Sequence, residues 1–253
     1  MANARPRLPV PVVAAELLPS VSVAQMREVD RLMTEVAGIS LIQMMENAGR
    51  ALADLTRGMV GGDVRGRRIS VLAGSGGNGG GGLVAARRLA GWGADVEVVL
   101  TAEPDTMRGA VGTQVAALAL TGARIGVAGG DESFSGQDVV LDALIGYSLS
   151  GPPRGAARDL IEAANRFSGT VIALDIPSGL DGDTGEASGP AVRAAATLTL
   201  ALPKHGLVAP GARQWVGDLY VADISVPAEV HRRAGTPVST PFATADLVRR
   251  SPD

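Results

Sequence analysis

Residues 67–90 read RRISVLAGSGGNGGGGLVAARRLA, and this stretch decides the fold. The apolar run over residues 68–74 predicts a buried strand, and the pattern from about residue 80 to residue 92 predicts a helix. Seven glycines occupy the nine positions 74–82 between the two elements. A glycine-rich turn from a strand into a helix is typical of α/β domains that bind an anion at the start of the helix.

The glycine run predicts a site for a phosphate-bearing ligand. Glycine tolerates positive φ and lets a ligand approach the backbone, so we expect the run to serve binding rather than packing. The ligand would lie over Asn78, Gly79 and Gly80, and a flexible turn is the alternative. A dinucleotide fingerprint fits less well, because the acidic residue expected at the end of the next strand is replaced by Glu103, a few residues late.

The alternation of strands and helices continues on both sides of this stretch. Two helices, at residues 22–36 and 41–60, precede the first strand, and further helices are expected at 105–120 and 154–166. The remaining strands are predicted at residues 96–100, 123–128, 138–146, 170–179, 197–202 and 219–226. Almost unbroken apolar strands indicate a parallel sheet covered on both faces, so we predict a doubly wound α/β domain with its site at the carboxyl ends of the strands.

The two ends of the chain differ from this pattern. We predict a flexible arm at residues 1–20, the α/β domain at 21–230, and a linker or tail at 231–253, in which residues 243–250 could form a short helix. The prolines and early Glu16 of the arm make it a poor signal peptide.

Composition excludes several classes of protein. The chain has 253 residues, of which 46% are hydrophobic, and its 23 Lys and Arg against 26 Asp and Glu give a net charge of −3. A balanced charge disfavours nucleic-acid binding. The absence of cysteine excludes disulfides and is compatible with the cytoplasm, and two histidines are too few for a multi-histidine metal centre. The longest uncharged run, residues 109–123, is too short to cross a membrane.

Two aspartates are candidates for chemistry. Asp142 and Asp175 each interrupt an apolar strand, where an unpaired carboxylate would cost several kcal/mol. A loop or cap hydrogen bond is the alternative for each aspartate taken alone, but two at equivalent strand ends beside a glycine run favour a site. The loop over residues 146–152 falls in the same crevice. Lys204 either meets a phosphate or is an ordinary residue at a strand end, and no G-x-S-x-G motif indicates a serine hydrolase.

Oxygen ligands predominate among these candidates. The amide of Asn78, the carboxylate of Asp142 and the hydroxyl of Ser178 suit a hard cation such as K⁺, Mg²⁺ or Ca²⁺. A single carboxylate favours an ion of low charge.

Seven motifs occur in an order that resembles the NAD(P)H-hydrate epimerase family, also called the YjeF N-terminal domain. They span roughly residues 20–228 and read QMREVDRLM, LIQMMENAG, GSGGNGGGGLVAARRLA, VVLDALIG, ALDIPSGLDGDTG, ALPKHG and DISVP. The resemblance implies a three-layer, Rossmann-like αβα sandwich with a mostly parallel sheet and two N-terminal helices, usually a homodimer. It also implies a K⁺-dependent isomerase that interconverts the R and S forms of hydrated NADH and NADPH.

The resemblance assigns roles to residues of this chain. Potassium would be held by Asn78, Asp142 and Ser178. The catalytic residues would be Asp175 and, as the fallback, Asp142. The hydrated dinucleotide would contact Gly77, Asn78, Gly79, Gly80, Gly81, Gly146, Tyr147, Ser148, Leu149, Ser150, Gly151, Pro152 and Asp175. The last residues, PFATADLVRRSPD, are similar to the start of the dehydratase domain in bifunctional relatives, so a fused or separate dehydratase is a possible partner.

One departure from the family pattern leaves alternatives open. The family loop usually reads Asn-Asn-Gly-Gly-Asp-Gly, whereas this chain has Gly77 in place of the first asparagine and Gly81 in place of the aspartate. The alternatives are a nucleotide-binding or scaffold module with impaired catalysis, and an isomerase or lyase with a changed substrate.

Overall fold

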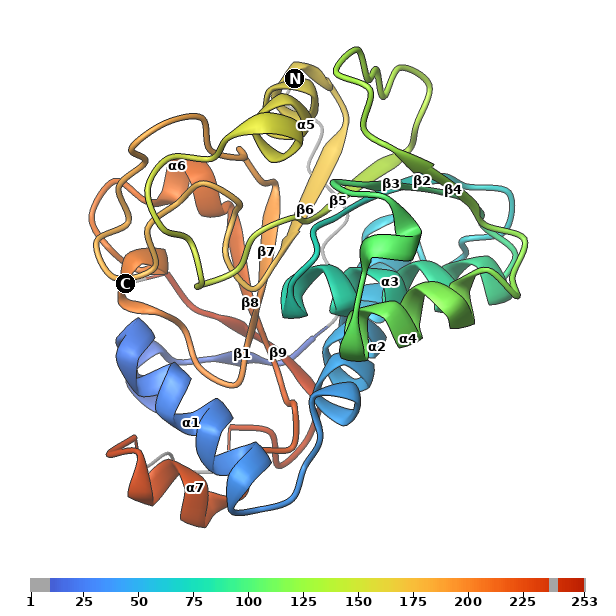
Figure 1. The fold of residues 1–253 in the computed structure, drawn as a ribbon. Coiled ribbons are helices and arrows are strands. Elements are labelled where there is room, and N and C mark those ends of the chain that lie inside the picture. Colours follow the sequence, from blue (N-terminus) through green and yellow to red (C-terminus); the bar gives the residue numbers. More distant parts are fainter. Residues whose placement is uncertain (1–9, 237–240, 253) are drawn as a thin grey trace.

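The described residues form a nine-stranded sheet that is the central layer of the fold. Figure 1 shows the arrangement of the elements in the computed structural model. The structure describes residues 10–236 and 241–252. The strand order is β1-β9-β8-β7-β6-β5-β2-β3-β4, and all neighbours are parallel except β8 and β9. The strands are β1 Val12–Val13, β2 Arg68–Ala73, β3 Asp95–Leu100, β4 Arg124–Val127, β5 Val139–Ala143, β6 Thr170–Leu174, β7 Ala196–Leu200, β8 Asp218–Ala222 and β9 Leu247–Arg250.

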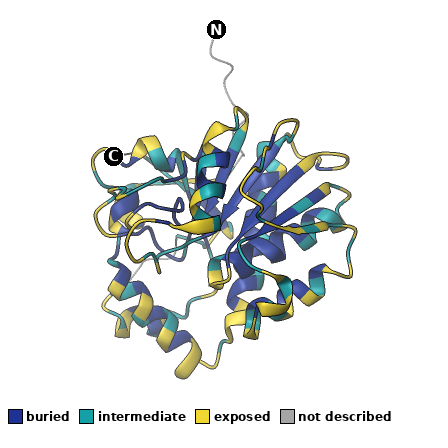
Figure 2. Ribbon diagram, turned by 45° about the horizontal axis from the view of Figure 1, so that its top comes forward, coloured by how far each residue is buried: buried dark blue, intermediate teal, exposed yellow. Residues whose placement is uncertain are grey.

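Helices cover both faces of the sheet, which confirms the three-layer sandwich. The helices are α1 Val23–Glu35, α2 Leu41–Met59, α3 Gly77–Gly91, α4 Gly109–Leu118, α5 Gly155–Arg166, α6 Arg213–Val216 and α7 Ala228–Arg233. The core on one face joins α2, α3 and α4 to the sheet, and the core on the other face joins α5 to it. Figure 2 shows the central strands buried and the outer sides of the helices exposed.

The two N-terminal helices begin as the sequence dictates. Ser22 and Ser40 each accept a hydrogen bond from the backbone N–H three residues later, and a glutamine at that position completes a capping box in both helices. Gly38 has a φ of 69°, so the chain turns sharply between α1 and α2. The apolar side of α1 then packs against α7 and the strand ends instead of the sheet face.

The connections around β2 create the crevice that contains the site. From β2 the chain runs to β3 and β4 on one side, and β5 then returns to the other side of β2. The loops after β2 and β5 therefore diverge at the carboxyl ends of neighbouring strands, which is where open α/β sheets bind ligands. The register pairs Leu72 with Asp142, so residues 74–78 and 144–148 emerge side by side.

Several predicted boundaries move in the structure. Helix α3 begins at Gly77 rather than near residue 80, so most of the glycine run is helical. Strand β6 ends at Leu174, since Asp175 has a φ of 65° and turns the chain out of the sheet. The helix expected at 105–120 is shorter and is preceded by a 3₁₀ turn at Pro104–Thr106.

Both ends of the described chain add to the sheet, which corrects the predicted arm and tail. Residues 243–250 do not form a helix, because Leu247–Arg250 pairs antiparallel with β8 as β9. Strand β1 pairs with β9 in turn. Leu18, Val221 and Val248 form a small buried cluster beneath these strands. The parts of the predicted arm and tail at residues 1–9, 237–240 and 253 lie outside the described residues.

Candidate active site

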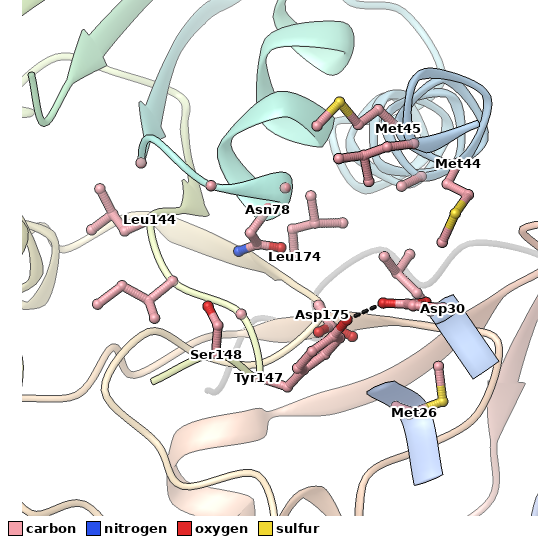
Figure 3. Close-up of a pocket in the computed structure, with 18 of the residues that line it drawn as sticks. Met26, Asp30, Met44, Met45, Asn78, Leu144, Tyr147, Ser148, Leu174 and Asp175 are labelled. Atoms are coloured by element: carbon pink, nitrogen blue, oxygen red, sulfur yellow. Dashed lines mark hydrogen bonds between the residues drawn. The ribbon is translucent and has the colours of Figure 1, made fainter. Parts of the chain in front are cut away.

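A cavity of about 560 Å³ occupies the crevice at the switch between β2 and β5. Its walls come from residues 74–78, from residues 144–148, and from side chains of α1 and α2. Figure 3 shows Asn78, Tyr147 and Asp175 around the same space, although they come from different segments of the chain. A concave, mostly apolar hollow with a few convergent polar groups is typical of a small-molecule site.

The glycine run shapes this cavity through packing. A Cβ on Gly79 would lie 1.8 Å from the carbonyl oxygen of Gly74, and one on Gly80 would lie 2.4 Å from Met45 Cε. Gly81 and Gly82 are similarly close to Leu174 and Ala143. None of the seven glycines has a positive φ. The expectation that the run serves binding rather than packing is therefore wrong for residues 79–82, which let α3 approach the sheet and α2.

Asn78 presents an amide at the start of α3. Its Nδ2 atom is buried and has no hydrogen-bond partner among the described residues. Gly146 lies close by, since a Cβ there would be 3.5 Å from Asn78 Cβ and 3.2 Å from Asp175 Oδ2. The first N–H groups of a helix have no carbonyl partner within it, so this corner of the cavity offers several donors to an anion.

Asp175 holds a buried ion pair at the end of β6. Its side chain is 5% exposed, and its Oδ1 accepts a hydrogen bond of 2.5 Å from Lys204 Nζ and one of 3.3 Å from Thr199 Oγ1. Lys204 is fully buried and also donates to Thr199 Oγ1 and to the carbonyl of Leu200, each at 3.2 Å. Because all three ammonium protons have acceptors, Lys204 is held in one position and fixes the orientation of the Asp175 carboxylate.

Tyr147 and Asp30 form a second polar pair on the cavity wall. The Tyr147 hydroxyl donates a hydrogen bond to Asp30 Oδ2, drawn as a dashed line in Figure 3. Burial raises the pKa of Asp30 above its usual value, although the bond from Tyr147 and the charge of Lys204 oppose this shift. Burial, together with the Asp30 charge, also raises the pKa of Tyr147. The phenol therefore stays protonated.

Asp142 lies behind the cavity wall and ties the loop after β5 to the loop after β6. Its carboxylate accepts hydrogen bonds from Ser178 N at 2.8 Å, Ser178 Oγ at 2.6 Å and Leu144 N at 3.2 Å. The Ser178 hydroxyl also accepts from Ile145 N at 2.9 Å. Complete burial raises the pKa of Asp142 to about 6, although these hydrogen bonds lower it. Every one of these partners is a neutral donor.

The structure brings six of the fifteen predicted site residues to the cavity. Those that line it are Gly77, Asn78, Gly146, Tyr147, Ser148 and Asp175. Those that do not are Gly79, Gly80, Gly81, Leu149, Ser150, Gly151, Pro152, Asp142 and Ser178. The assigned ligand, catalytic and potassium roles remain predictions for both groups.

Sequence reasoning missed several residues of the wall. Met26, Met44 and Met45 give it an adaptable apolar surface that suits a flat ring. Asp30 was not singled out, although it interrupts the apolar stripe of α1 four residues after the buried Met26. That interruption is the signal that could have identified it.

A metal-binding cluster of side chains and a membrane-spanning helix are both absent from the described residues. No group of three or more His, Cys, Asp or Glu side chains is placed to hold a metal ion in that part of the chain. No helix within residues 10–236 and 241–252 is long and apolar enough to cross a membrane.

Comparisons with known proteins agree with the fold and the motifs. Residues 41–206 match the family described as YjeF-related protein N-terminus. An NAD(P)H-hydrate epimerase of Dehalogenimonas lykanthroporepellens is 44% identical over 230 residues, which cover 90% of this chain and 91% of that protein. A bifunctional NAD(P)H-hydrate repair enzyme Nnr of Thermofilum pendens is 42% identical over 81% of this chain, which spans only 40% of that enzyme.

A solved structure supports the same assignment. The crystal structure of the yeast protein YNL200c superimposes with a TM-score of 0.77 and 25% sequence identity, covering 92% of this chain and all of that one. The sequence match extends over most of the domain, and the fold agrees with it. The chain therefore belongs to the family of proteins related to the YjeF N-terminus.

Proposed function

We propose that this protein is an NAD(P)H-hydrate epimerase, an isomerase that interconverts the R and S forms of hydrated NADH and NADPH. The observation that carries the proposal is the composition of one cavity. The exposed start of α3 and the fixed carboxylate of Asp175 face the same space. The start of α3 can bind the pyrophosphate of the substrate, and the Asp175 carboxylate can transfer the proton that epimerisation requires.

The chemistry of the substrate defines what the site must do. The C6 hydroxyl of the hydrated nicotinamide lies next to N1, so the N1 lone pair can expel it and leave a planar iminium. Water then adds at C6 from the other face. The enzyme has to protonate the leaving oxygen and remove a proton from the entering water, which is general acid–base catalysis.

The residues around the cavity fit these tasks. Asp175 is the acid–base group, and Lys204 and Thr199 are positioning residues that hold its Oδ1. The backbone of residues 74–78 binds the pyrophosphate at the start of α3. The methionine side chains of α1 and α2 pack against the nicotinamide and exclude bulk water.

Potassium fits the residues around Asp142, and we include it in the proposal. In the described part of the chain the buried Asp142 carboxylate is met by neutral donors alone, so a monovalent cation would offset its charge. Asn78, whose buried Nδ2 has no hydrogen-bond partner within the described residues, would supply its amide oxygen and Ser178 its hydroxyl. Potassium is too weak a Lewis acid to ionise water, so it would organise the loops.

The proposal extends to partners and location. A dehydratase, fused or separate, would consume one of the two epimers, and the cysteine-free sequence is compatible with the cytoplasm. We also expect a homodimer. Val36, Leu41 and Ile42, beside the turn between α1 and α2, are exposed apolar side chains that such a contact would cover.

The test is direct conversion of one pure epimer. Purified protein is incubated with the R hydrate, and inversion is followed by chromatography that separates the two epimers, with and without KCl. We expect conversion well above the spontaneous rate. Conversion at the spontaneous rate would contradict the proposal, and ligand-dependent thermal stabilisation without conversion would favour the binding-module alternative.

A further inference from the structure

The pair Tyr147–Asp30 is a partly buried polar group that the proposed mechanism leaves unused. Tyr147 belongs to the loop after β5 and Asp30 to α1, so the contact joins segments 117 residues apart. Both side chains line the cavity that contains Asp175. The phenol hydrogen-bonds to a carboxylate in a mostly apolar wall, whereas a residue that only filled space would need no hydroxyl there.

Lys204 connects this pair to Asp175. Its ammonium, 2.5 Å from Asp175 Oδ1, lies 6.0 Å from the centre of the Tyr147 ring. The cavity therefore holds two carboxylates with different partners: an ammonium beside Asp175 and a neutral phenol beside Asp30. Sites that need both an acid and a base commonly place two such groups in contrasting environments.

We propose that the Tyr147 hydroxyl, backed by Asp30, is a second acid–base group of this site, complementary to Asp175. The inference rests on the proposed epimerase function. The step uses the protonated form of Asp30, which donates to the Tyr147 oxygen while the phenol hydroxyl turns from Asp30 to the substrate. As the C6–O bond breaks, the hydroxyl of Tyr147 gives its proton to the leaving oxygen and takes one from Asp30. Water then bonds to C6 and gives its proton to Asp175. Transfer of that proton back to Asp30 restores both groups.

The surroundings of Asp30 support this division of tasks. Its carboxyl is faced by Tyr147 from the loop after β5, by Asp175 from the end of β6 and by Lys204 after β7, and Arg27 of its own helix acts on Tyr147. Burial dominates, so the pKa of Asp30 is raised. Asp30 therefore keeps its proton to a higher pH than an ordinary carboxylic acid, as a proton donor requires.

The experiment compares the unaltered protein with Tyr147→Phe, Asp30→Asn and the control Glu28→Gln. Glu28 lies on the same helix, is exposed and pairs with Arg31 outside the cavity. We expect kcat to fall roughly 10²-fold in the first two variants, with KM changed by less than about 3-fold, and to stay unchanged in the control. Asp30→Asn should also remove the alkaline limb of the pH–rate profile, which a purely structural role would not.

Thermal unfolding of all four proteins shows whether the variants remain folded. The inference is overturned if folded Tyr147→Phe keeps the kcat of the unaltered protein, or if Asp30→Asn loses rate but keeps both limbs of the profile. In these cases the unaltered protein still converts the R hydrate, so the proposed function stands. Absence of conversion by the unaltered protein overturns both proposals.

Discussion

The ends of β5 and β6 each carry a buried aspartate, and the two are held in different ways. Asp142 is enclosed by backbone and hydroxyl donors and does not reach the cavity, whereas Asp175 faces the cavity and is paired with the buried ammonium of Lys204. Similar sequence contexts thus produce a loop tether in one case and a candidate acid–base group in the other. The partner of a buried carboxylate indicates its role better than its position on the strand.

Substitutions of Asp142 and Asp175, at the ends of β5 and β6, should differ most in their effect on the rate of epimerisation. Asp175→Asn removes the carboxylate that exchanges protons, so kcat should fall by roughly 10²–10⁴-fold. Asp142→Asn keeps an oxygen that can accept from Ser178 and should retain a larger share of the rate. Initial rates on the R hydrate, with KCl present, measure both. A larger loss in Asp142→Asn than in Asp175→Asn would reverse the assignment of roles.

Lys204→Met should have the largest effect on stability. It leaves the Asp175 carboxylate buried without its cation, and breaking one side of a buried ion pair typically costs about 3–5 kcal/mol. Urea unfolding measures the loss. The double variant Asp175→Asn with Lys204→Met leaves no buried charge and should recover part of it. If the double variant loses as much stability as the two single variants combined, the two side chains are not energetically coupled.

The dependence of stability on pH should identify Asp142. Its pKa is about 6 in the folded protein against 3.8 ordinarily, because burial disfavours the charged form. The unfolded chain therefore loses its proton first as the pH rises, and the free energy of unfolding should fall between about pH 4 and pH 6, by on the order of 3 kcal/mol, and level off above.

Asp142→Asn should remove this part of the pH dependence, since it has no proton to lose. Denaturant unfolding of both proteins at closely spaced pH values gives the difference. Added KCl should diminish the loss in the unaltered protein if the ion offsets the carboxylate charge. Curves for the two proteins that remain parallel from pH 4 to pH 6.5 would show that Asp142 is not responsible.

Ser178→Ala should have a smaller effect, confined to the end of β5. The hydroxyl joins Asp142 to Ile145 N, and its loss leaves the partly buried N–H of Ile145 without this partner, at a cost of about 1 kcal/mol. Ser75→Ala, an exposed position on the cavity loop, is the matched control and should be near neutral. Equal stability of the two variants would argue against the tether.

Much of the fold follows from local patterns in the sequence. The buried strands and capped helices were predictable, because their apolar periodicity and their Ser-x-x-Gln caps lie within a few residues. Strand β9 was missed, since residues 247–250 carry two arginines and become a strand only by pairing with β8. The local sequence carries no signal of pairing with a strand that lies far away along the chain.

The site was predictable in its outline and unpredictable in its contacts. The two aspartates and the glycine run were found because they interrupt apolar patterns. The packing role of Gly79–Gly82 could not be predicted from the sequence, because it depends on Met45, Leu174 and Ala143 from other elements. The partners of Asp30 and Asp175 likewise lie 117 and 29 residues away along the chain.

A crystal structure of the protein soaked with a hydrated nicotinamide dinucleotide and KCl tests the central claim most directly. We expect the pyrophosphate to lie against residues 74–78 at the start of α3 and the nicotinamide ring to lie within hydrogen-bonding reach of Asp175. Density for the dinucleotide at another surface, with this cavity free of ligand, would contradict it.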